Sequence, residues 1–378
     1  MCVHGILLGV IMKKNLYLIK NGKLIRKQNT LYFVSKKEEQ PEKTSGTGQK
    51  PEFVEEYEGE ESPLEPEDVS DAPEYEKRPL PIEQTDAIFA FGRISLTSGV
   101  ISFFSKYSVP IHFFGYYGHY ESTLIPKDSL LSGEMHIRQA SWYLDPKKRL
   151  ALAKKFVTGS AANILKNLEY YRNEGKPVEG EIADILAFVE QAETIKNVGQ
   201  LLAAEGNIRS LYYSTFDKIL KNGFSFGGRS RQPPANPLNA MISFGNSLVY
   251  GLTINAIYKT QLDQTISFLH EPSERRFSLS LDVSEIFKPL LVDRVIFKLV
   301  NKDMISPEDF RTDLGSCLLN DKGKRIFLTE FNEKLETTIK HRDLGRNVSY
   351  QRLVYLECIK LGKQFTGMKD YKPFAIWW

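Results

Sequence analysis

The chain has 378 residues, of which 42% are hydrophobic and 12% aromatic, so it is long enough for two domains with cores of their own. Its three cysteines, Cys2, Cys317 and Cys358, have no disulfide or zinc-ligand spacing. This excludes a disulfide scaffold and a zinc module and fits a reduced, cytoplasmic protein. The formal net charge is +3, and no segment predicts a transmembrane span.

The first residues differ from those that follow. The run from Gly5 to Met12 is apolar but short, and it lacks the small-residue cleavage site of a signal peptide. Met12, followed by Lys13 and Lys14, is a more natural start. We therefore expect residues 1–11 to be a mis-assigned extension.

Charge is distributed unevenly along the chain. Residues 36–78 hold fifteen acidic and six basic side chains, which leaves 44 Lys and Arg against 32 Asp and Glu in the rest. A folded part that is this basic favours a polyanionic partner, most simply nucleic acid. A basic protein without such a partner is the alternative.

Residues 12–125 predict a small β domain. Alternating apolar residues favour two or three strands over 12–35, with Asn21-Gly22 as a hairpin turn. Further strands are expected over 87–91, over 94–96 and within 111–125, with a short helix over 98–107. His112 and His119 lie in the last of these segments, and we expect both to be strand residues and not metal ligands.

The segment 36–78 inside this domain has a different composition. It is rich in Glu, Pro, Gly and Ser and almost free of aliphatic residues, so it cannot bury enough apolar surface to fold. We expect a disordered acidic insertion. It is either inert or a competitor of nucleic acid for the basic face of the protein.

Residues 130–378 predict an all-helical domain. Asp145-Pro146 is typical of an N-cap followed by a first-turn proline. Further helices are expected over 183–198, 197–220, 325–341 and 349–365, with starts also at Asn236-Pro237 and Ser306-Pro307. The segment 239–257 is apolar on nearly every side, which predicts a central, buried helix.

Glu205 lies on the apolar stripe of the helix expected over 197–220, between Leu201 and Ile208. A carboxylate on a buried face is costly unless it is paired, protonated or bound to a cation. An ion pair with Arg209, one turn further on, would explain its position. So would a functional role, and both explanations stay open at this point.

The stretch from Leu262 to Phe297 brings one histidine and two acids together between apolar segments. His270 is followed, after a basic connection, by Asp282 and Glu285, and acids three apart share one face of a helix. An imidazole with carboxylates suits magnesium or manganese. The alternative is a helix capping box, with Asp282 as cap and Glu285 as its partner, beside a histidine that only makes hydrogen bonds.

Several motifs in the chain point jointly to one family. They are Leu16-Tyr-Leu with the short hairpin after it, IHFFGYYGHYES, Glu205-Gly206 with Arg209 and Tyr213, PPANPLNAMISFGNSLVYG, LHEPSERRFSLSLDVSEIFKP, and the closing YKPFAIWW. On these motifs the chain resembles, over nearly all of residues 12–378, the CRISPR-associated endonuclease that acts as the integrase in spacer acquisition, the Cas-one family. The LHEP motif and the closing segment are most similar to those of type I systems.

The resemblance implies an α+β fold, with a small N-terminal β-sandwich-like domain and a larger helical catalytic domain. It implies a homodimer, a complex with the smaller Cas-two protein, and double-stranded DNA as the substrate. It also implies Mg²⁺ or Mn²⁺ held by Glu205, His270 and Glu285, with Asp282 as a fourth catalytic residue that orients His270 or a metal-bound water. The expected reaction is the insertion of spacers into a CRISPR array by attack of a DNA 3′-hydroxyl on a phosphodiester.

Basic and aromatic side chains near this set are candidates for contacts to DNA. They are Arg209, Tyr212, Tyr213, Lys221, Arg229, Arg231, Arg275 and Arg276. Each could equally be a solvated surface charge or an ordinary core aromatic. Two rival functions stay open: a DNA-binding scaffold without activity, and a metal-dependent nuclease of repair or recombination that only cleaves.

Overall fold

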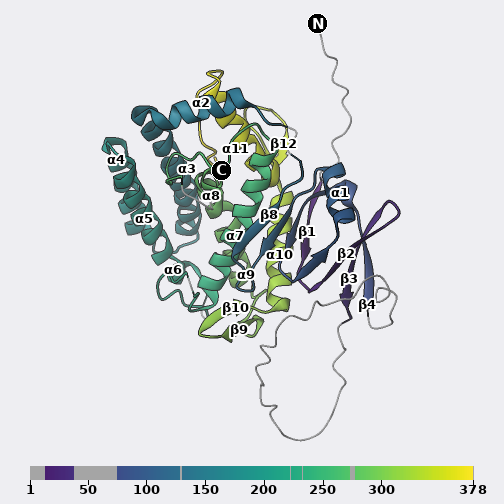
Figure 1. The fold of residues 1–378 in the computed structure, drawn as a ribbon. Coiled ribbons are helices and arrows are strands. Elements are labelled where there is room, and N and C mark those ends of the chain that lie inside the picture. Colours follow the sequence, from purple (N-terminus) through teal and green to yellow (C-terminus); the bar gives the residue numbers. More distant parts are fainter. Residues whose placement is uncertain are drawn as a thin grey trace, which may run out of the picture. The chain divides into compact units, whose positions relative to one another are not determined.

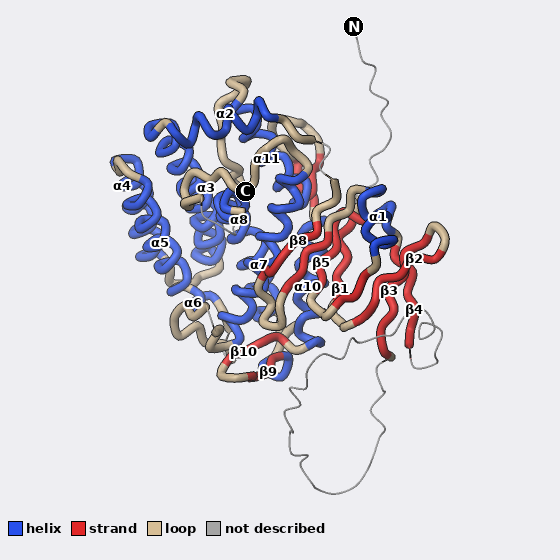
Figure 2. Tube along the Cα trace, viewed as in Figure 1, coloured by secondary structure: helices blue, strands red, loops and turns tan. Residues whose placement is uncertain are grey.

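The computed structural model describes residues 13–37, 75–127, 130–221, 223–231, 233–272 and 277–377. The chain divides into two compact units, Met1–Phe113 with Thr123–Lys127, and Phe114–Ser122 with Asp128–Trp378. Strands dominate the first unit and helices the second (Figure 1, Figure 2), so the expected mixture of a β-rich N-terminal region and a helix-rich C-terminal region is confirmed. Residues 1–11, most of the predicted acidic insertion, Arg275 and Arg276 lie outside the described residues.

The N-terminal region contains two four-stranded sheets with the strand orders β1-β5-β7-β8 and β4-β3-β2-β6. The strands of the first sheet are β1 (Lys14–Leu18), β5 (Thr85–Ala90), β7 (Ile111–Phe114) and β8 (Tyr120–Leu124). Those of the second are β2 (Gly22–Lys27), β3 (Thr30–Lys36), β4 (Tyr75–Leu80) and β6 (Ile94–Leu96). Both sheets and the helix α1 (Ser98–Tyr107) contribute to one hydrophobic cluster that includes Leu18, Leu24, Ile88 and Phe103.

The expected hairpin turn at Asn21-Gly22 is wrong. The chain changes sheets there, because β1 pairs with β5 in parallel while β2 pairs with β3 in antiparallel. The hairpin turn lies instead at Gln28 and the following residue, between the paired Lys27 and Thr30, and Gln28 adopts φ 56°. Such a left-handed residue is what a tight two-residue turn requires.

Two other expectations for this region need correction. The predicted disordered segment 36–78 is too long at both ends, because Lys36 ends β3 and Tyr75 begins β4, and these two residues are paired across the strands. His119 lies in the turn between β7 and β8, where its carbonyl accepts from Gly115 N, so it is not a strand residue. His112 is in β7 as expected and is fully buried.

The C-terminal unit is built from ten helices within the described residues. They are α2 (Gly133–Leu144), α3 (Pro146–Asn173), α4 (Glu179–Thr194), α5 (Val198–Ser214), α6 (Phe216–Ile219), α7 (Pro237–Tyr258), α8 (Ser278–Lys288), α9 (Arg294–Asn301), α10 (Asp321–Glu336) and α11 (Tyr350–Phe365). The expected cap is confirmed, since the Asp145 carboxylate accepts from Lys147 N and Lys148 N at the start of α3. Asn197 and Asn236 cap α5 and α7 in the same way.

The helix α7 runs through the middle of this unit (Figure 1), as its sequence predicted. Its length of 22 residues and mean hydropathy of 1.2 would allow it to cross a membrane, but 78% of that apolar window is buried inside the protein. It is the core helix against which α8 and α11 pack.

The prediction that this unit is all-helical is wrong in detail. Two short antiparallel pairs interrupt the helices, β9 (Phe310–Asp313) with β10 (Ser316–Leu319) and β11 (Thr338–Lys340) with β12 (Asn347–Ser349). Ser306-Pro307 starts only a 3-10 turn, Pro307–Asp309, that leads into β9. Leu314 and Gly315 both adopt positive φ and close the first hairpin, which a helical reading of this segment does not anticipate.

Candidate metal and DNA site

The segment that carries the predicted acids is one continuous helix with a π-helical turn inside it. The helix α8 passes into the turn Pro289–Asp293 and then into α9. Pro289 lacks the N–H that would bond to the carbonyl of Glu285, four residues earlier, so the regular ladder is broken there. Such turns occur mostly as single interruptions of α-helices and frequently at functional sites.

A row of polar side chains on α3 satisfies the carbonyls that this interruption releases. Ser160 Oγ donates to Glu285 O at 2.9 Å, Asn163 Nδ2 to Ile286 O at 2.9 Å, and Asn167 Nδ2 to Pro289 O at 2.8 Å. All three side chains are buried, and their spacing places them on one face of α3. Because buried backbone acceptors are costly when unpaired, this row fixes the backbone that carries Glu285.

Asp282 is not a helix cap. It lies inside α8, is fully buried, and its carboxylate accepts from the backbone N–H groups of Phe268, Leu269 and His270 at 2.7, 3.0 and 3.0 Å. The capping-box alternative is therefore wrong, because α8 starts at Ser278, before Asp282. The acid instead ties the loop of His270 to the helix of Glu285.

The same carboxylate orients the imidazole of His270. Nδ1 lies 2.8 Å from Asp282 Oδ1, so Nδ1 carries the proton of that hydrogen bond and Nε2 is the nitrogen left to coordinate. Burial by itself lowers the pKa of His270, but the hydrogen bond and charge of Asp282 and the charge of Glu285 outweigh it, so the pKa is raised. Arg149 donates to Phe268 O and so holds the preceding loop from the side of α3.

Glu205 and Glu285 share one cation, the guanidinium of Arg209. Arg209 Nε donates to Glu205 at 3.0 Å, and its Nη2 donates to Glu285. Glu285 also pairs with Lys288, one turn further along α8. The side chains of Arg209 and Glu285 are only 10% and 9% exposed, so these are buried ion pairs. The ion-pair explanation for Glu205 is thus confirmed, and Lys288 is a member of the cluster that sequence reasoning missed.

The electrostatics of this cluster follow from its neighbours. Burial alone would raise the pKa of Glu285, but the charges of Arg209 and Lys288 hold that pKa well below its usual range. Burial likewise opposes ionisation of Arg209, and the charge of Glu285 keeps the pKa of Arg209 high. Glu285 is therefore ionised at neutral pH and neutralised by two side-chain cations.

The donors fit a divalent cation by their chemistry. Two carboxylates that already share one positive charge, beside an imidazole with one free nitrogen, are the ligand types that Mg²⁺ and Mn²⁺ accept. As they stand, no three His, Cys, Asp or Glu side chains in the described part of the chain are arranged to hold a metal ion. Glu205 and Glu285 are both engaged by the guanidinium of Arg209 instead.

Asp293, the last residue of the π-helical turn, is a second buried acid beside this cluster. It is fully buried, and within the described residues no cation is paired with its carboxyl group. Burial raises its pKa to about 7, against the opposing charges of Arg209 and Lys288 and the facing hydroxyl of Tyr212. The sequence carried a signal for it, an acid in the apolar run PLLVDRVIF, which is the same kind of signal that singled out Glu205.

Comparison with known proteins places the chain in a family. The family model described as CRISPR associated protein Cas1 matches residues 65–333. The chain belongs to the Cas1 family. A Cas1 protein from Methanobrevibacter ruminantium is 50% identical, over 97% of this chain and 99% of the relative. A CRISPR-associated endonuclease Cas1 from Thermodesulfovibrio yellowstonii is 40% identical, over 97% of this chain and all of the relative.

Solved structures agree with this assignment. A CAS1 protein from Thermotoga maritima superposes with a TM-score of 0.78 at 30% identity, covering 96% of this chain and all of that one. A chain in a Cas6-RT-Cas1–Cas2 complex has the same fold, with a TM-score of 0.72 at 16% identity, covering 100% of this chain and 37% of that one. The resemblance to the Cas1 family predicted from the sequence motifs is confirmed.

Three of the residues expected to contact DNA in this Cas1-family chain lie in the interior. Arg209 is bound between the two acids, so it belongs to the ion-pair cluster and not to a surface. Tyr212 has no exposed surface, and its hydroxyl accepts from Asn167. Tyr213 is 4% exposed and packs against Phe226. The apolar face of α5 buries both rings, so neither tyrosine is presented to a ligand here.

The remaining candidates that the structure describes lie nearer the surface. Lys221 pairs with Asp303 at 2.9 Å, and half of its side chain is exposed. Arg229 is half-buried and donates to Asn239 Oδ1 and Ser243 Oγ, so it braces its loop against α7. Arg231, two residues on, is exposed. Of the predicted DNA-contact set, Lys221, Arg229 and Arg231 therefore remain among the described residues.

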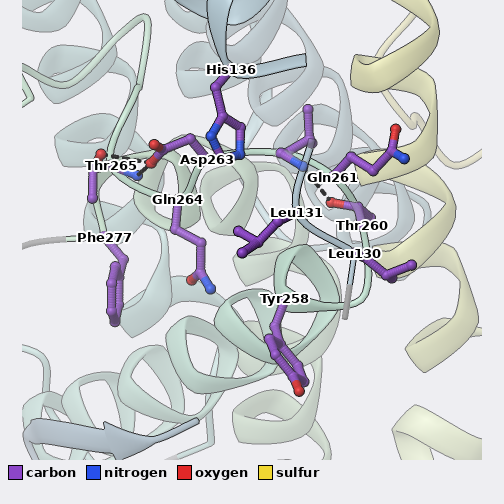
Figure 3. A pocket seen from close by; sticks show the side chains of 11 residues that line it. Leu130, Leu131, His136, Tyr258, Thr260, Gln261, Asp263, Gln264, Thr265 and Phe277 are labelled. Carbon is purple, nitrogen blue, oxygen red and sulfur yellow. Dashed lines mark hydrogen bonds between the residues drawn. The ribbon is translucent and has the colours of Figure 1, made fainter. Parts of the chain in front are cut away.

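A cavity of about 210 Å³ lies between the start of the C-terminal unit and the end of α7 (Figure 3). Its described lining is mixed: Leu131, Tyr258 and Phe277 are apolar or aromatic, while His136 and Gln264 are polar. Glu205, His270 and Glu285 are not among the described residues that line it. It is therefore distinct from the acid cluster.

Proposed function

We propose that this protein is a divalent-metal-dependent DNA endonuclease and integrase that inserts short DNA fragments, spacers, into a CRISPR array. Membership of the Cas1 family supports the endonuclease and integrase activity. The single observation that carries the metal assignment is that Glu205 and Glu285, from two helices, hold one cation between them beside His270.

Glu205, His270 and Glu285 are the residues that would hold Mg²⁺ or Mn²⁺. When bound, such an ion neutralises charge on a phosphate oxygen and lowers the pKa of an attacking hydroxyl. The protein's own contribution is positioning. Asp282 fixes the His270 ring so that Nε2 is presented, and the α3 row fixes the backbone of Glu285.

The reaction is a transesterification that balances without an oxidant or reductant. A 3′-hydroxyl of the incoming DNA forms a new bond to phosphorus, and the bond to another 3′-oxygen breaks. The attacking oxygen loses its proton, and the departing oxygen gains one. Negative charge accumulates on the phosphate, where fixed cationic groups stabilise the transition state more than the ground state.

DNA contact is assigned to the basic surface residues and not to the buried ones. Lys221, Arg229 and Arg231 lie on or beside one loop and would bind phosphates, which gives affinity without sequence selectivity. Arg275 and Arg276 remain candidates from sequence. A homodimer and a complex with the smaller Cas2 protein complete the proposal, and they follow from the family. A Cas1 chain of the same fold occurs in a complex with Cas2.

Strand transfer tests this function. The purified protein, with its small partner, is incubated with a short duplex that has free 3′ ends and with a supercoiled plasmid that carries the repeat. Joined product is expected with Mg²⁺ or Mn²⁺ and is expected to disappear in EDTA and in Glu205→Ala. Glu190→Ala, which removes an exposed acid of α4, is the matched control and should retain activity. DNA binding without joining in any cation would favour a scaffold instead.

A further inference from the structure

Metal binding at the proposed site requires a rearrangement of charge. Arg209 now donates to both Glu205 and Glu285, and its guanidinium is nearly buried. A divalent cation that takes these carboxylates displaces the guanidinium from them and repels it at short range. A displaced, buried guanidinium without an anion is strongly unfavourable, so a second acceptor must lie within its reach.

Within the described residues, the interior around Arg209 offers one acid that is not paired with a cation. Asp293 is fully buried, and the hydroxyl of Tyr212 faces its carboxyl group. Its charge and that of Arg209 act on each other, and both also act on Tyr213 of α5. The carboxyl of Asp293 therefore faces the side of α5 that carries Arg209 and Tyr212.

The backbone holds Asp293 in this position. It ends the π-helical turn, and that turn is anchored where Asn167 donates to Pro289 O. Asn167 also donates to the Tyr212 hydroxyl at 3.0 Å and accepts from Arg294 Nε at 2.6 Å. Asn167 thus fixes the π-helical turn at Pro289, and it also holds Tyr212, which faces Asp293, and Arg294, which follows it. A buried acid without a cation in so constrained a place destabilises the fold, and this cost suggests a function.

We propose that Asp293 is a positioning residue that receives the Arg209 guanidinium when a divalent cation occupies Glu205, His270 and Glu285. Arg209 then alternates between two sets of carboxylates: Glu205 with Glu285 in the metal-free protein, and Asp293 in the metal-bound one. Asp293 acts through Arg209 and touches neither metal nor DNA. The raised pKa of Asp293 is consistent with this, because the acid has no cation of its own in the metal-free protein. This inference rests on the proposed metal site.

The consequence is a thermodynamic coupling between three groups. With Asp293 present, the displaced guanidinium gains a charged hydrogen-bond partner and the cost of metal binding is reduced. Without Asp293, that cost is not offset and metal affinity falls. Without Arg209 there is no guanidinium to receive, and Asp293 loses its influence on the metal.

A double-mutant cycle tests the inference with Mn²⁺ as the probe, measured by isothermal titration calorimetry and by electron paramagnetic resonance of the free ion. Asp293→Asn is expected to weaken Mn²⁺ binding about tenfold, which corresponds to ~1.4 kcal/mol. Arg209→Gln is expected to bind Mn²⁺ at least as tightly as wild type. Asp293→Asn is expected to have no further effect in the Arg209→Gln background.

A second readout follows Arg209 itself. The side-chain Nε–H resonance of Arg209 is expected to shift when diamagnetic Mg²⁺ is added to the wild-type protein and to shift differently in Asp293→Asn. Glu330→Gln is the matched control, because it removes another buried acid that pairs with Lys298 and not with Arg209. Thermal melting confirms that each variant is folded before its affinity is compared.

The outcomes separate the inference from the function on which it rests. If wild type binds Mn²⁺ and Asp293→Asn binds it equally well, the inference is overturned and the metal site stands. An equal loss of affinity in the wild-type and Arg209→Gln backgrounds also overturns it, because Asp293 would then act independently of Arg209. If wild type does not bind Mn²⁺ in any assay, the metal site itself is wrong and the inference is rejected with it.

Discussion

Glu205 on α5 and Glu285 on α8 hold the same guanidinium, that of Arg209. Two acids from separate helices share this one cation, and the charge of the pair is balanced only when a second cation is added. The proposed function places a divalent ion at these acids, and in the structure the protein's own cations offset their charge. Lys288 extends the same arrangement on the other side of Glu285.

Asp282→Asn keeps the His270 ring but removes the carboxylate that orients it, so it tests whether that orientation matters. The amide can accept from only one oxygen, so it loses acceptors for the N–H groups of Phe268, Leu269 and His270. We expect a loss of stability of about 1–3 kcal/mol, because buried donors lose their partners. We also expect Mn²⁺ affinity to fall by roughly 10- to 100-fold, as for other residues that orient a ligand.

Urea unfolding and Mn²⁺ calorimetry measure the two effects separately. The control is Asp263→Asn, since Asp263 caps an exposed turn of the same loop through Thr265 N. Asp263→Asn should change neither the free energy of unfolding nor the Mn²⁺ affinity by a comparable amount. An Asp282→Asn protein that retains wild-type Mn²⁺ affinity would show that the His270 ring needs no such support.

Asp293 predicts an unusual dependence of stability on pH. Its pKa is about 7 in the folded protein and about 4 in the unfolded chain. Between these values the folded state binds more protons, so stability contributed by this group is present below pH 4 and is lost as the pH rises to 7. The slope approaches about 1.4 kcal/mol per pH unit in this window.

The comparison of wild type with Asp293→Asn isolates this contribution from those of the other titrating groups. The stability of wild type relative to the variant should fall from pH 4 to pH 7 and then level off, in unfolding experiments without divalent ions. Curves that run parallel over this range would mean that Asp293 is ionised in the fold and has a partner.

Much of the fold follows from local sequence signals. The helix starts predicted at Asp145, Asn197 and Asn236 are correct, and the structure shows each of these side chains capping its helix, a signal that acts locally. The helix Ser98–Tyr107 and the buried helix α7 were also evident. The hairpins β9–β10 and β11–β12 were not, because their strands of three or four residues are too short to show alternation.

The candidate site was only partly predictable for a different reason. Motifs gave Glu205, His270, Asp282 and Glu285, but they could not show that Asp282 binds three backbone N–H groups from a distant loop. Spacing along α5 did place Tyr212 on the apolar stripe with Ile208, and the structure buries it, but no spacing could reveal that Arg229 braces its loop against α7. Such roles depend on contacts between segments far apart in the chain, which periodicity does not report.

Asn163→Leu should release the C-terminal tail from its attachment beside α8. Asn163 Nδ2 donates to Ile286 O and Phe374 O, and its Oδ1 accepts from Ile376 N, all between 2.9 and 3.0 Å. Leucine fills a similar volume without these bonds and leaves buried groups unpaired. We expect a loss of about 3 kcal/mol or more and faster removal of the tail by carboxypeptidase. Ser160→Ala, which loses only the bond to Glu285 O, should leave the rate of tail digestion unchanged.

Gly245→Ala should disturb the π-helical turn from the side of α7. A methyl group at Gly245 would lie 2.4 Å from Val292 Cγ1, inside the turn, and 3.0 Å from Phe327 Cζ. Alanine favours a helix over glycine by about 1 kcal/mol, but overpacking of a filled core costs about 1–3 kcal/mol. We expect the clash to prevail, because Val292 is itself fully buried and has no room to move.

Thermal melting of Gly245→Ala beside Gly206→Ala decides whether this close approach matters. A methyl group at Gly206, in the interior of α5, meets no atom of the described residues within 4 Å, so this variant should gain stability from helix propensity alone. The two substitutions are chemically identical and differ in what surrounds them. Equal gains in melting temperature in both variants would show that the π-helical turn shifts to make room for the methyl group. The position of Asp293 would then not be set by packing against α7.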